Sequence, residues 1–299
     1  MPDRAPVGLI GIGLMGQALA QRLLGAGFAV LGFDVEPAKG DWLAQHGGRV
    51  AASVAALARE ADPILLAVFS TDQVEEVVDR HIMPALAPGT RRVLLCTSTC
   101  DPDTIAALGE RAIAHGLRFL EIPVSGTSEQ VRRGEGVALM GGEAGVLPEL
   151  APLLDALFAS RFHVGRLGDG GRAKLAVNLI LGLNRLALAE GLVFAERMGL
   201  DPASFLAVAR GSAAYSQVMD TKGPKMVRGD FAPEGRVRQT LKDVHLMLAQ
   251  AQAHGQRLSA LEVHEQMLAA CVRHGEADLD NCRIIAEVRR QGSRNERDK

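Results

Sequence analysis

Two side chains four positions apart are the best suited to proton transfer in this sequence. Lys174 is followed by the apolar residues Leu175, Ala176 and Val177 and then by Asn178. Residues four apart share one face of a helix, so the amine and the amide point the same way. An amine near a helix N-terminus and against apolar surface should have a lowered pKa, because both surroundings disfavour its charge. Such a base can take the hydroxyl proton of an alcohol while a hydride leaves the carbon.

Other interpretations of these residue types were weighed. The alternative for Lys174 is an amine that reaches solvent at the start of a helix. The eight histidines are less suited to the proton transfer, since each lies in an amphipathic helix or a turn-like context. None of the histidines has a metal-ligand partner at a suitable spacing, and H-E-x-x-H is absent from the sequence. We therefore predict no metal site.

A glycine-rich loop supplies the strongest local motif. It follows a short apolar segment and precedes a helical one, and it consists of Gly11, Ile12, Gly13, Leu14, Met15 and Gly16. The first glycine allows a tight turn, the second lets the backbone approach a pyrophosphate, and the third lets the helix pack on the strand. The helix N-terminus then offers N–H groups to the phosphates. The alternatives are a turn and helix cap without ligand, a flavin, or a methyl donor on a related fold.

An acidic residue at the end of the second predicted strand points to the cofactor. Asp34 lies 23 positions after Gly11 and is followed by Val35, Glu36 and Pro37, with no arginine directly after it. A carboxylate there accepts hydrogen bonds from ribose hydroxyls and repels a 2′-phosphate. The sequence therefore favours NAD as the cofactor, with NADP less favoured.

A small polar loop is the third motif. Ser125, Gly126 and Thr127 come shortly after the predicted strand 118–122. In a doubly wound sheet, ligands lie at the carboxyl ends of the strands. Backbone N–H groups and hydroxyls of this loop are able to hold a substrate carboxylate. The alternative is a polar turn without a ligand.

The elements that must position these residues alternate in the first half of the chain. Strands are predicted at 7–11, 29–33, 63–68, 92–96, 118–122 and 137–140, with helices at 17–24, 53–59, 73–78 and 102–115. Several of these strands are continuously apolar, as parallel strands covered on both faces are. The alternation predicts an α/β fold of the Rossmann type, a doubly wound and mostly parallel sheet.

The second half of the chain has a different pattern. A long helix is predicted over 174–198, apolar on nearly every side and therefore buried, and further helices at 202–209, 241–253, 259–272 and 280–289. We expect a dinucleotide-binding domain over 1–165 and an all-helical domain for substrate binding and oligomerisation over 166–299, packed around the long helix. The glycine-rich segment 165–171 would form the hinge, and the polar tail 291–299 is expected to be disordered.

The composition and the net charge limit which binding partners and which cellular compartment we expect for the protein. The net charge is −2, which gives little support to a nucleic-acid or anionic-membrane partner. The four cysteines form no C-x-x-C pair, and we interpret them as reduced thiols of a cytoplasmic protein. No secretory signal is recognised at the N-terminus, and the apolar run 7–14 is too short to span a bilayer.

In this order, the three motifs resemble those of the β-hydroxyacid dehydrogenase family. That family includes 3-hydroxyisobutyrate dehydrogenase and tartronate semialdehyde reductase and is related to 6-phosphogluconate dehydrogenase. The resemblance extends from about residue 7 to residue 289. It rests on the glycine loop, on the Pro-Val-Ser-Gly stretch that ends at Gly126, on the Gly-Asp-Gly stretch before Lys174, and on the pair Lys242 and Asp243.

The resemblance implies a role for each matching residue. Lys174 would be the general acid/base, Asn178 would orient the substrate, and Ser125 and Gly126 would hold its carboxylate. The residues implied to contact the cofactor, besides the glycine loop and Asp34, are Phe69, Gln73, Thr99 and Lys242. The substrate would be a small 3-hydroxy acid similar to 3-hydroxyisobutyrate. The long helix would take part in an oligomer contact, which implies a homodimer or homotetramer.

The chain departs from the family pattern in its substrate loop. Thr127 stands where the family usually has a second glycine, Gln130 where it tends to have glycine, and Arg132 and Arg133 where small residues are usual. These departures leave the identity of the acid open. Tyr215 and Ser216 lie where members of the family vary their pocket.

Three alternatives to a 3-hydroxyacid dehydrogenase stay open. One is a reductase of tartronate semialdehyde or succinic semialdehyde type. A second is an imine reductase on the same fold, which is disfavoured because relatives of that type typically lack the lysine at position 174. The third is a non-catalytic dinucleotide-binding or chromatin-associated module, which is disfavoured by the charge of −2 and by the lack of a basic tail.

Overall fold

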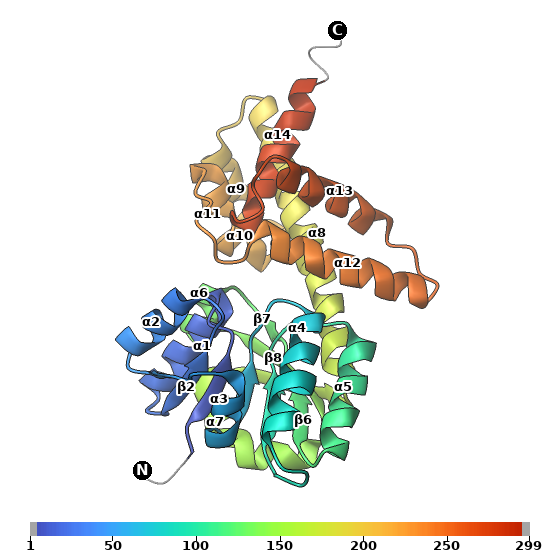
Figure 1. Ribbon diagram of the computed structural model, residues 1–299. Coiled ribbons are helices and arrows are strands. Elements are labelled where there is room, and N and C mark those ends of the chain that lie inside the picture. Colours follow the sequence, from blue (N-terminus) through green and yellow to red (C-terminus); the bar gives the residue numbers. More distant parts are fainter. Residues whose placement is uncertain (1–4, 295–299) are drawn as a thin grey trace. The chain divides into compact units, whose positions relative to one another are not determined.

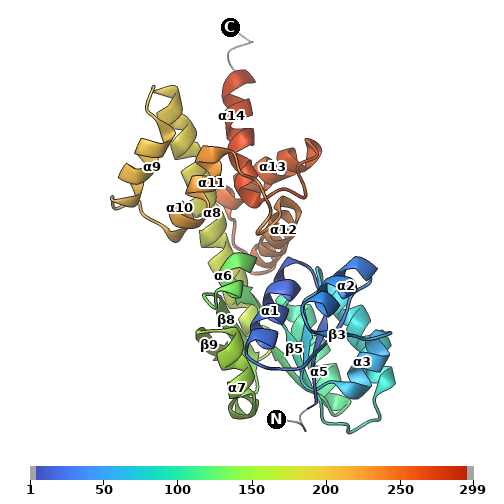
Figure 2. The ribbon, with the colours of Figure 1, turned by 90° about the vertical axis from the view of Figure 1, so that its left-hand side faces the viewer.

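The computed structural model describes residues 5–294, which divide into two compact units between Lys174 and Leu175. The first unit combines a β-sheet with helices, and the second is built from helices (Figure 1). Helix α8 (Asp169–Arg197) begins in the first unit and continues through the boundary (Figure 2). The predicted fold class, a doubly wound and mostly parallel sheet followed by a helical domain, is confirmed. The structural division falls later than the predicted hinge because the first turn of α8 is bonded to the sheet.

The sheet of the first unit has nine strands among the described residues. Its order is β3-β2-β1-β4-β5-β6-β8-β7, and β9 pairs with β8. From β3 through β6 all neighbours are parallel, whereas β8 runs antiparallel to both β6 and β7. The strands are β1 (Val7–Ile10), β2 (Val30–Phe33), β3 (Arg49–Val50), β4 (Ile64–Leu66), β5 (Val93–Cys96), β6 (Arg118–Glu121), β7 (Val124–Ser125), β8 (Val137–Gly142) and β9 (Ser160–Gly165).

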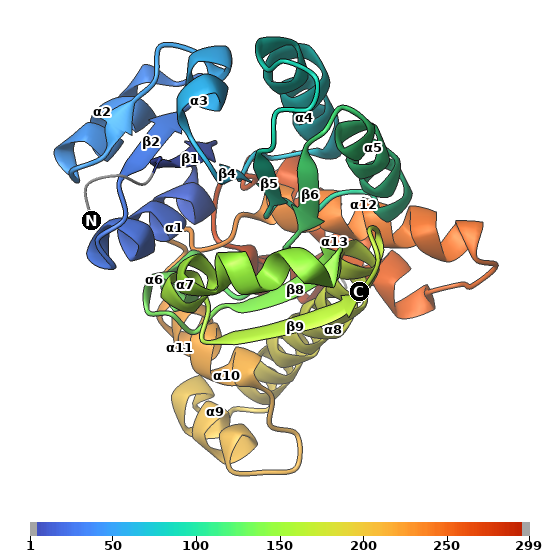
Figure 3. The same ribbon diagram turned by 90° about the horizontal axis from the view of Figure 1, so that it is seen from below.

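Helices cover both faces of this sheet. Those of the first unit are α1 (Leu14–Gly25), α2 (Pro37–Gln45), α3 (Val54–Glu60), α4 (Thr71–Glu75), continued by the π-helix η1 (Glu76–Ile82) and the short 3-10 helix η2 (Met83–Ala85), α5 (Pro102–Ala114), α6 (Ser128–Arg132), and α7 (Leu147–Leu157) after the 3-10 helix η3 (Ala144–Val146). Along β4, Leu65 packs with α1 and α7, whereas Ile64 and Leu66 pack with α3, α4 and α5. Figure 3 shows these two helical layers on opposite sides of the strands. The continuously apolar strands are explained by this burial on both faces.

Six of the strands match the predicted ones, and three were not predicted. β3 and β7 have two residues each, too few for a pattern of side chains to indicate a strand. β9 lies at the edge of the sheet, and four of its six residues are exposed. Its sequence therefore lacks the apolar character by which the central strands were recognised.

The second unit packs its helices around one apolar core. Buried residues of this core include Leu192 on α8, Met226 on α11, Leu268 on α13 and Ile285 on α14. The helices after α8 are α9 (Pro202–Arg210), α10 (Gln217–Thr221), α11 (Gly223–Arg228), α12 (Val237–Ala253), α13 (Ser259–Arg273), the 3-10 helix η4 (Asn281–Arg283) and α14 (Ile284–Arg294). The predicted disordered tail began at residue 291, but α14 continues to Arg294, and residues 295–299 lie outside the described part of the chain.

Helix α8 is buried on one side only, so the prediction that it is buried all round was wrong. Leu188 and Leu192 belong to the core, whereas Ile180 is 62% exposed and Phe194 is 66% exposed. By length and composition alone α8 is able to cross a membrane, and core helices of soluble proteins meet the same criterion. One side of the helix is therefore both apolar and exposed, which sequence periodicity could not reveal.

A buried histidine lies in the middle of the second unit. His264 on α13 is fully buried and packs against Gly182 of α8, where a Cβ would lie 2.8 Å from the ring. Neither ring nitrogen has a hydrogen-bond partner among the described residues. Burial, and secondarily the charge of Arg185, lowers the pKa of His264 to about 3. The imidazole is therefore neutral in the folded protein at neutral pH.

We predict that His264 makes the stability of the protein fall in acid. Because its pKa is about 3 in the folded protein and about 6.5 in the unfolded chain, its contribution is complete above pH 6.5 and is lost as the pH falls toward 3. Between pH 7 and pH 4.5 the free energy of unfolding should drop by about 2–3 kcal/mol more in the wild type than in His264→Leu. Urea unfolding at both pH values measures this difference, and equal losses in the two proteins would contradict it.

Candidate active site

The carboxyl ends of the parallel strands form one row across the first unit. The registers of neighbouring strands pair Phe33 with Ile10, Ile10 with Leu66, Leu66 with Cys96, and Cys96 with Glu121. These residues end β2, β1, β4, β5 and β6. The loops that follow the strands therefore leave the sheet at one edge, where ligands of doubly wound folds bind. The cofactor loops that the sequence indicated begin at this edge, and the predicted substrate loop follows β7, which is separated from the end of β6 by two residues.

Two positions of the loop between β1 and α1 require glycine. Gly11 has a φ of +92°, and a Cβ there would lie 2.5 Å from the carbonyl oxygen of Ala67. A Cβ on Gly16 would lie 2.0 Å from the carbonyl oxygen of Gly11. By contrast, a Cβ on Gly13 would have no neighbour within 4 Å. The loop is thus closed against the protein at Gly11 and Gly16 and open at Gly13, where a pyrophosphate would approach.

The N-terminus of α1 is left without a capping side chain. Its N-cap is Gly13, and no acidic residue lies in its first turn. By contrast, the side chains of Ser53, Asp101 and Asp201 accept backbone N–H bonds at the starts of α3, α5 and α9. Uncapped N–H groups and the positive end of the helix suit an anion. The residues present therefore fit a dinucleotide, whose pyrophosphate the glycine loop and the first turn of α1 would hold.

Asp34, directly after β2, is bonded to the same loop. Its Oδ2 accepts a hydrogen bond from the N–H of Ile12 at 2.6 Å, and its Oδ1 accepts one from the N–H of Glu36 at 2.9 Å. Each carboxylate oxygen has a further lone pair that is able to accept a hydrogen bond from a ribose hydroxyl. Asp34 thus fixes the glycine loop, and its contact with the ribose stays a prediction.

The loops after β4 and β5 carry the other predicted cofactor residues. Gln73 accepts the backbone N–H of Phe69 at 2.8 Å through its Oε1, which folds the loop onto the start of α4. The hydroxyls of Thr97 and Ser98 donate to backbone carbonyls of β4 and of the loop after it, at 2.9 and 2.8 Å. Thr99 follows them and is half-buried. These bonds hold the two loops together, and the contacts of Phe69, Gln73 and Thr99 with a cofactor stay predictions.

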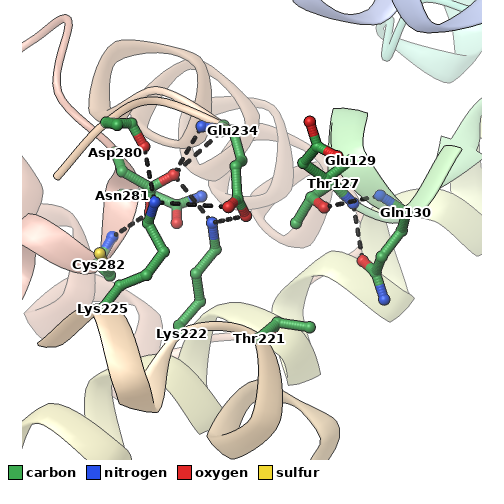
Figure 4. A network of polar contacts seen from close by, with 12 residues as sticks. Thr127, Glu129, Gln130, Thr221, Lys222, Lys225, Glu234, Asp280, Asn281 and Cys282 are labelled. Atoms are coloured by element: carbon green, nitrogen blue, oxygen red, sulfur yellow. Dashed lines mark hydrogen bonds and ion pairs between the residues drawn. The ribbon is translucent and has the colours of Figure 1, made fainter. Parts of the chain in front are cut away.

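The predicted substrate loop joins β7 to α6. Ser125 ends β7 and is half-buried, and Gly126 has a φ of +139°, which a larger residue adopts only with strain. Thr127 caps α6, since its hydroxyl accepts the N–H of Gln130 at 3.2 Å and its N–H donates to Oε1 of Gln130 at 2.9 Å (Figure 4). The departures from the family pattern at Thr127 and Gln130 thus form a reciprocal capping box. The backbone N–H of Thr127 is engaged there, so its predicted contact with the substrate has no independent support.

Helix α8 begins at Asp169, five residues before Lys174, and not at the lysine itself as predicted. The field of a helix end falls off within its first turn, so that part of the argument for a lowered lysine pKa no longer applies. Lys174 is nevertheless only 5% exposed. The amine is therefore held within the protein, and the alternative interpretation of a lysine extended into solvent is wrong.

Glu121, the residue that ends β6, has a place in the structure that the sequence did not indicate. It is 2% exposed, and its carboxylate accepts the N–H groups of Gly170 and Gly171 at 2.9 and 3.0 Å. The start of α8 is thereby bonded to the end of β6, from which the substrate loop also departs. A charged residue at the end of a buried apolar strand was the signal available in the sequence, and the glycine pair was interpreted only as part of a hinge.

Asn178 and Lys242 lie in the second unit and are joined there by one carboxylate. Asp243 accepts a hydrogen bond from Nδ2 of Asn178 at 3.1 Å through Oδ2, and Nζ of Lys242 lies 3.0 Å from its Oδ1. The Oδ1 atom of Asn178 is buried without a hydrogen-bond partner among the described residues. Asp243 therefore fixes the amide of Asn178 so that its oxygen stays available as an acceptor for a hydroxyl or an amine.

A buried ionic network holds the segment that precedes α12, the helix that carries Lys242. Nζ of Lys222 lies 3.0 Å from Oε2 of Glu234 and 2.9 Å from Oδ2 of Asp280, and all three residues belong to the second unit (Figure 4). Asp280 also accepts the backbone N–H of Glu234 at 2.8 Å. Because Lys222 and Asp280 are buried, removing one charge would leave the other unpaired. The network therefore has a structural role, which fixes the start of α12.

Two sequence families match consecutive parts of the chain. The family described as the NAD binding domain of 6-phosphogluconate dehydrogenase matches residues 6–165. The family described as NAD-binding of NADP-dependent 3-hydroxyisobutyrate dehydrogenase matches residues 168–288. The first covers the sheet and its helices, and the second covers α8 and most of the helical unit.

Individual proteins are similar over nearly the whole chain. L-threonate dehydrogenase of Cupriavidus necator is 31% identical over 276 residues, which are 91% of this chain and 93% of that protein. The mitochondrial 3-hydroxyisobutyrate dehydrogenase-like 2 of Arabidopsis thaliana is 28% identical over 291 residues, 97% of this chain and 95% of that protein. A solved structure of 3-hydroxyisobutyrate dehydrogenase from Mycobacterium tuberculosis with L-serine is 26% identical, with a TM-score of 0.84, over 96% of this chain and 100% of that one.

The glycine loop allows ligand binding and folding to be tested separately. Gly13→Ala should leave the melting temperature unchanged, because the added Cβ meets nothing, but should weaken NAD(H) binding by about tenfold or more by blocking the approach of the pyrophosphate. Gly16→Ala should destabilise the fold, because its Cβ collides with the backbone. Thermal melts and fluorescence titration with NADH measure both effects.

Gly25→Ala at the far end of α1, also without close neighbours, serves as the control. Unaltered NADH affinity in a folded Gly13→Ala protein would show that the loop does not receive the cofactor in this way.

Proposed function

The chain belongs to the β-hydroxyacid dehydrogenase family, and we propose that it oxidises a short 3-hydroxy acid with NAD, using Lys174 as the general acid/base. The family and the curated relatives make it an NAD(P)-dependent oxidoreductase of hydroxy acids. The identity of the acid, the preference for NAD and the role of the lysine are the parts of this statement that we propose.

One observation carries the proposal for Lys174. The amine is buried on a helix whose first turn is bonded to Glu121, at the strand edge from which the substrate loop and the cofactor loops depart. Such an edge is where doubly wound folds bind their ligands. A buried amine on a helix that starts at this edge is suited to exchange a proton with a bound alcohol.

The substrate class is supported by the chemistry of the loop and by the similar proteins. Ser125 offers a hydroxyl beside Gly126, whose φ of +139° other residues adopt only with strain. L-Threonate and L-serine, named with two of the similar proteins, both have a hydroxyl on C3, counting the carboxylate carbon as C1. A short acid with a hydroxyl at that position is therefore the proposed substrate.

The reaction needs a proton acceptor and a fixed alcohol. Bound nicotinamide would accept the hydride from the carbinol carbon, so that the acid becomes a carbonyl compound. Neutral Lys174 takes the hydroxyl proton as the carbon–oxygen double bond forms, and in the reverse direction its ammonium returns that proton. Ser125 and the backbone at Gly126 hold the carboxylate. The role of Asn178, whose amide Asp243 orients within the second unit, stays what the family resemblance implies. The lysine proton finally leaves to solvent.

The preference for NAD is supported by charge. Asp34 and the exposed Glu36 place two carboxylates directly after β2, and the intervening Val35 offers no cation. A 2′-phosphate would have to approach these carboxylates, which costs free energy, whereas a ribose hydroxyl donates to one of them. We therefore propose NAD as the working cofactor.

We predict that Lys174→Ala loses about a thousandfold in kcat for oxidation but still binds NADH with wild-type affinity. Lys174→Arg is the matched control, because it keeps the positive charge but does not lose its proton near neutral pH, and it should be equally inactive. Added methylamine should restore part of the activity of Lys174→Ala only. Turnover within tenfold of the wild type in both variants would reject Lys174 as the acid/base.

The substrate and the cofactor are tested together in one screen. The purified protein is assayed with NAD and with NADP against 3-hydroxyisobutyrate, L-serine, glycerate and L-threonate, and in the reverse direction against the corresponding carbonyl compounds. We expect turnover of at least one acid, with a higher kcat/KM for NAD. Reduction of cyclic imines with NADPH, together with inactivity on every acid, would instead favour the imine reductase.

We propose that the protein is a homodimer joined through the exposed side of α8. Exposed or half-exposed apolar residues recur on that side over about five turns, at positions separated by three or four residues or their multiples, including Val177, Ile180, Ala187 and Phe194. A row of exposed apolar side chains of this length on a soluble protein marks an interaction site. A second copy of the same helix offers a matching surface, as a two-fold contact requires.

Ile180→Asp should convert the dimer to a monomer, because it would bury a charge in each half of the contact. Ile113→Asp on α5, a half-exposed apolar residue of the other unit, is the control and should remain dimeric. Size-exclusion chromatography with light scattering at about 20 μM measures the masses. A wild-type monomer, or an unchanged dimer in Ile180→Asp, would refute the proposed contact.

A cytoplasmic location is also proposed, supported by four buried cysteines that are all free.

A further inference from the structure

The carboxylate of Glu121 occupies a slot built from three glycines. A Cβ on Gly141, the partner of Glu121 on β8, would lie 2.3 Å from Oε1. A Cβ on Gly170 would lie 3.0 Å from the carboxyl carbon, and one on Gly171 would lie 3.3 Å from Oε2. Any side chain at the first two positions would therefore collide with the carboxylate. The sequence supplies glycine at each place where the backbone comes close to it.

The surroundings of Glu121 disfavour its charge. Burial raises the pKa of Glu121, although the backbone N–H groups of Gly171, Gly170 and Gly168 partly oppose the rise, and the charge of Asp169 adds to it. Asp169 itself accepts hydrogen bonds from Arg172 at 2.9 Å and from the N–H of Arg166 at 3.1 Å. A carboxylate kept in a buried place that disfavours its charge points to a functional constraint.

The bonds of Glu121 link two parts of the predicted active site. The residue ends β6, and the substrate loop with Ser125 follows it after three residues. Its partners are the second and third residues of α8, and Lys174 follows Gly171 after less than one turn. A helix is stiff over one turn, so a shift of its first residues moves the lysine with them. The carboxylate thus sets the distance between the substrate loop and the amine, all within the first unit.

We propose that Glu121 is a positioning residue, which fixes the start of α8 against the end of β6 so that the amine of Lys174 meets the alcohol held by the substrate loop. The inference rests on the proposed role of Lys174. Displacement of a catalytic group by about 1 Å is able to cost about a hundredfold in rate. Loss of the anchor should therefore reduce kcat and leave the glycine loop and its cofactor unaffected.

The first test is Glu121→Gln, which keeps the shape of the side chain but replaces one acceptor oxygen with an N–H₂ group facing a backbone N–H. We expect kcat for oxidation of 3-hydroxyisobutyrate with NAD to fall at least tenfold, while KM for NAD stays within twofold. Removing a negative charge near the start of α8 should also lower the pKa of the Lys174 amine. The acid limb of the kcat/KM profile, which requires the neutral amine, should therefore move to lower pH. Displacement of the helix alone would lower the rate without moving the limb, so a moved limb reports the loss of charge.

Two glycine variants separate displacement of the helix from loss of charge. Gly170→Ala keeps Glu121 but places a Cβ 2.8 Å from the carbonyl oxygen of Leu139, so the first turn must shift, and kcat should fall without a shift of the acid limb. Gly171→Ala meets Oε2 of Glu121 at 3.3 Å and should have a smaller effect. Ser53→Ala, which removes the cap of α3 in the same unit, is the control for loss of a helix cap and should keep wild-type kcat.

The outcomes distinguish this inference from the proposed function. Wild-type kcat and an unmoved limb in Glu121→Gln, together with an inactive Lys174→Ala, would overturn the positioning role alone. Retained activity in Lys174→Ala would overturn the proposed function whatever the Glu121 variants do. If Glu121→Gln does not fold, Gly170→Ala decides the question: a folded variant with wild-type kcat would overturn the proposal.

Discussion

Parallel strands that end in register impose the geometry on which the site depends. The strands β2, β1, β4, β5 and β6 end in one row. The loops that follow them therefore begin at the same edge of the sheet, each at a position fixed by its strand. Side-chain bonds then join neighbouring loops, as when Asp34 binds the N–H of Ile12 and Ser98 binds the carbonyl of Val68. The edge therefore behaves as one preorganised surface, and a cofactor that binds it need not order the loops.

The N-termini of α1 and α8 at this edge differ in whether a side chain of the protein binds their N–H groups. At α1 the first turn is uncapped and Gly13 leaves open space, which suits an external phosphate. At α8 the same kind of N–H groups bind the protein's own carboxylate, Glu121, in a slot that admits little else. The N-terminus of α1 is thus left open, whereas that of α8 is bonded to the end of β6. The difference follows from which residue ends the strand beside each helix.

The sequence predicted those features that residue type and spacing along the chain indicate. The apolar runs revealed the buried strands, and the spacing from Gly11 to Asp34 revealed the dinucleotide loop. The features that the sequence did not predict depend on contacts between residues far apart in the chain. The bond between Glu121 and Gly170 joins residues 49 positions apart, and the capping role of Thr127 was hidden by comparison with a family that has glycine there. The exposed side of α8 was mistaken for core, because apolar residues on every side of a helix fit either burial or an assembly contact.

A crystal structure of the protein with NAD and a bound 3-hydroxy acid, or a non-reacting analogue of it, tests the central claim most directly. The account predicts the Lys174 amine within hydrogen-bond distance, about 3 Å, of the alcohol oxygen, with the acid's carboxylate at Ser125 and Gly126. A complex in which the lysine is turned away from the alcohol and another side chain contacts that oxygen would contradict it.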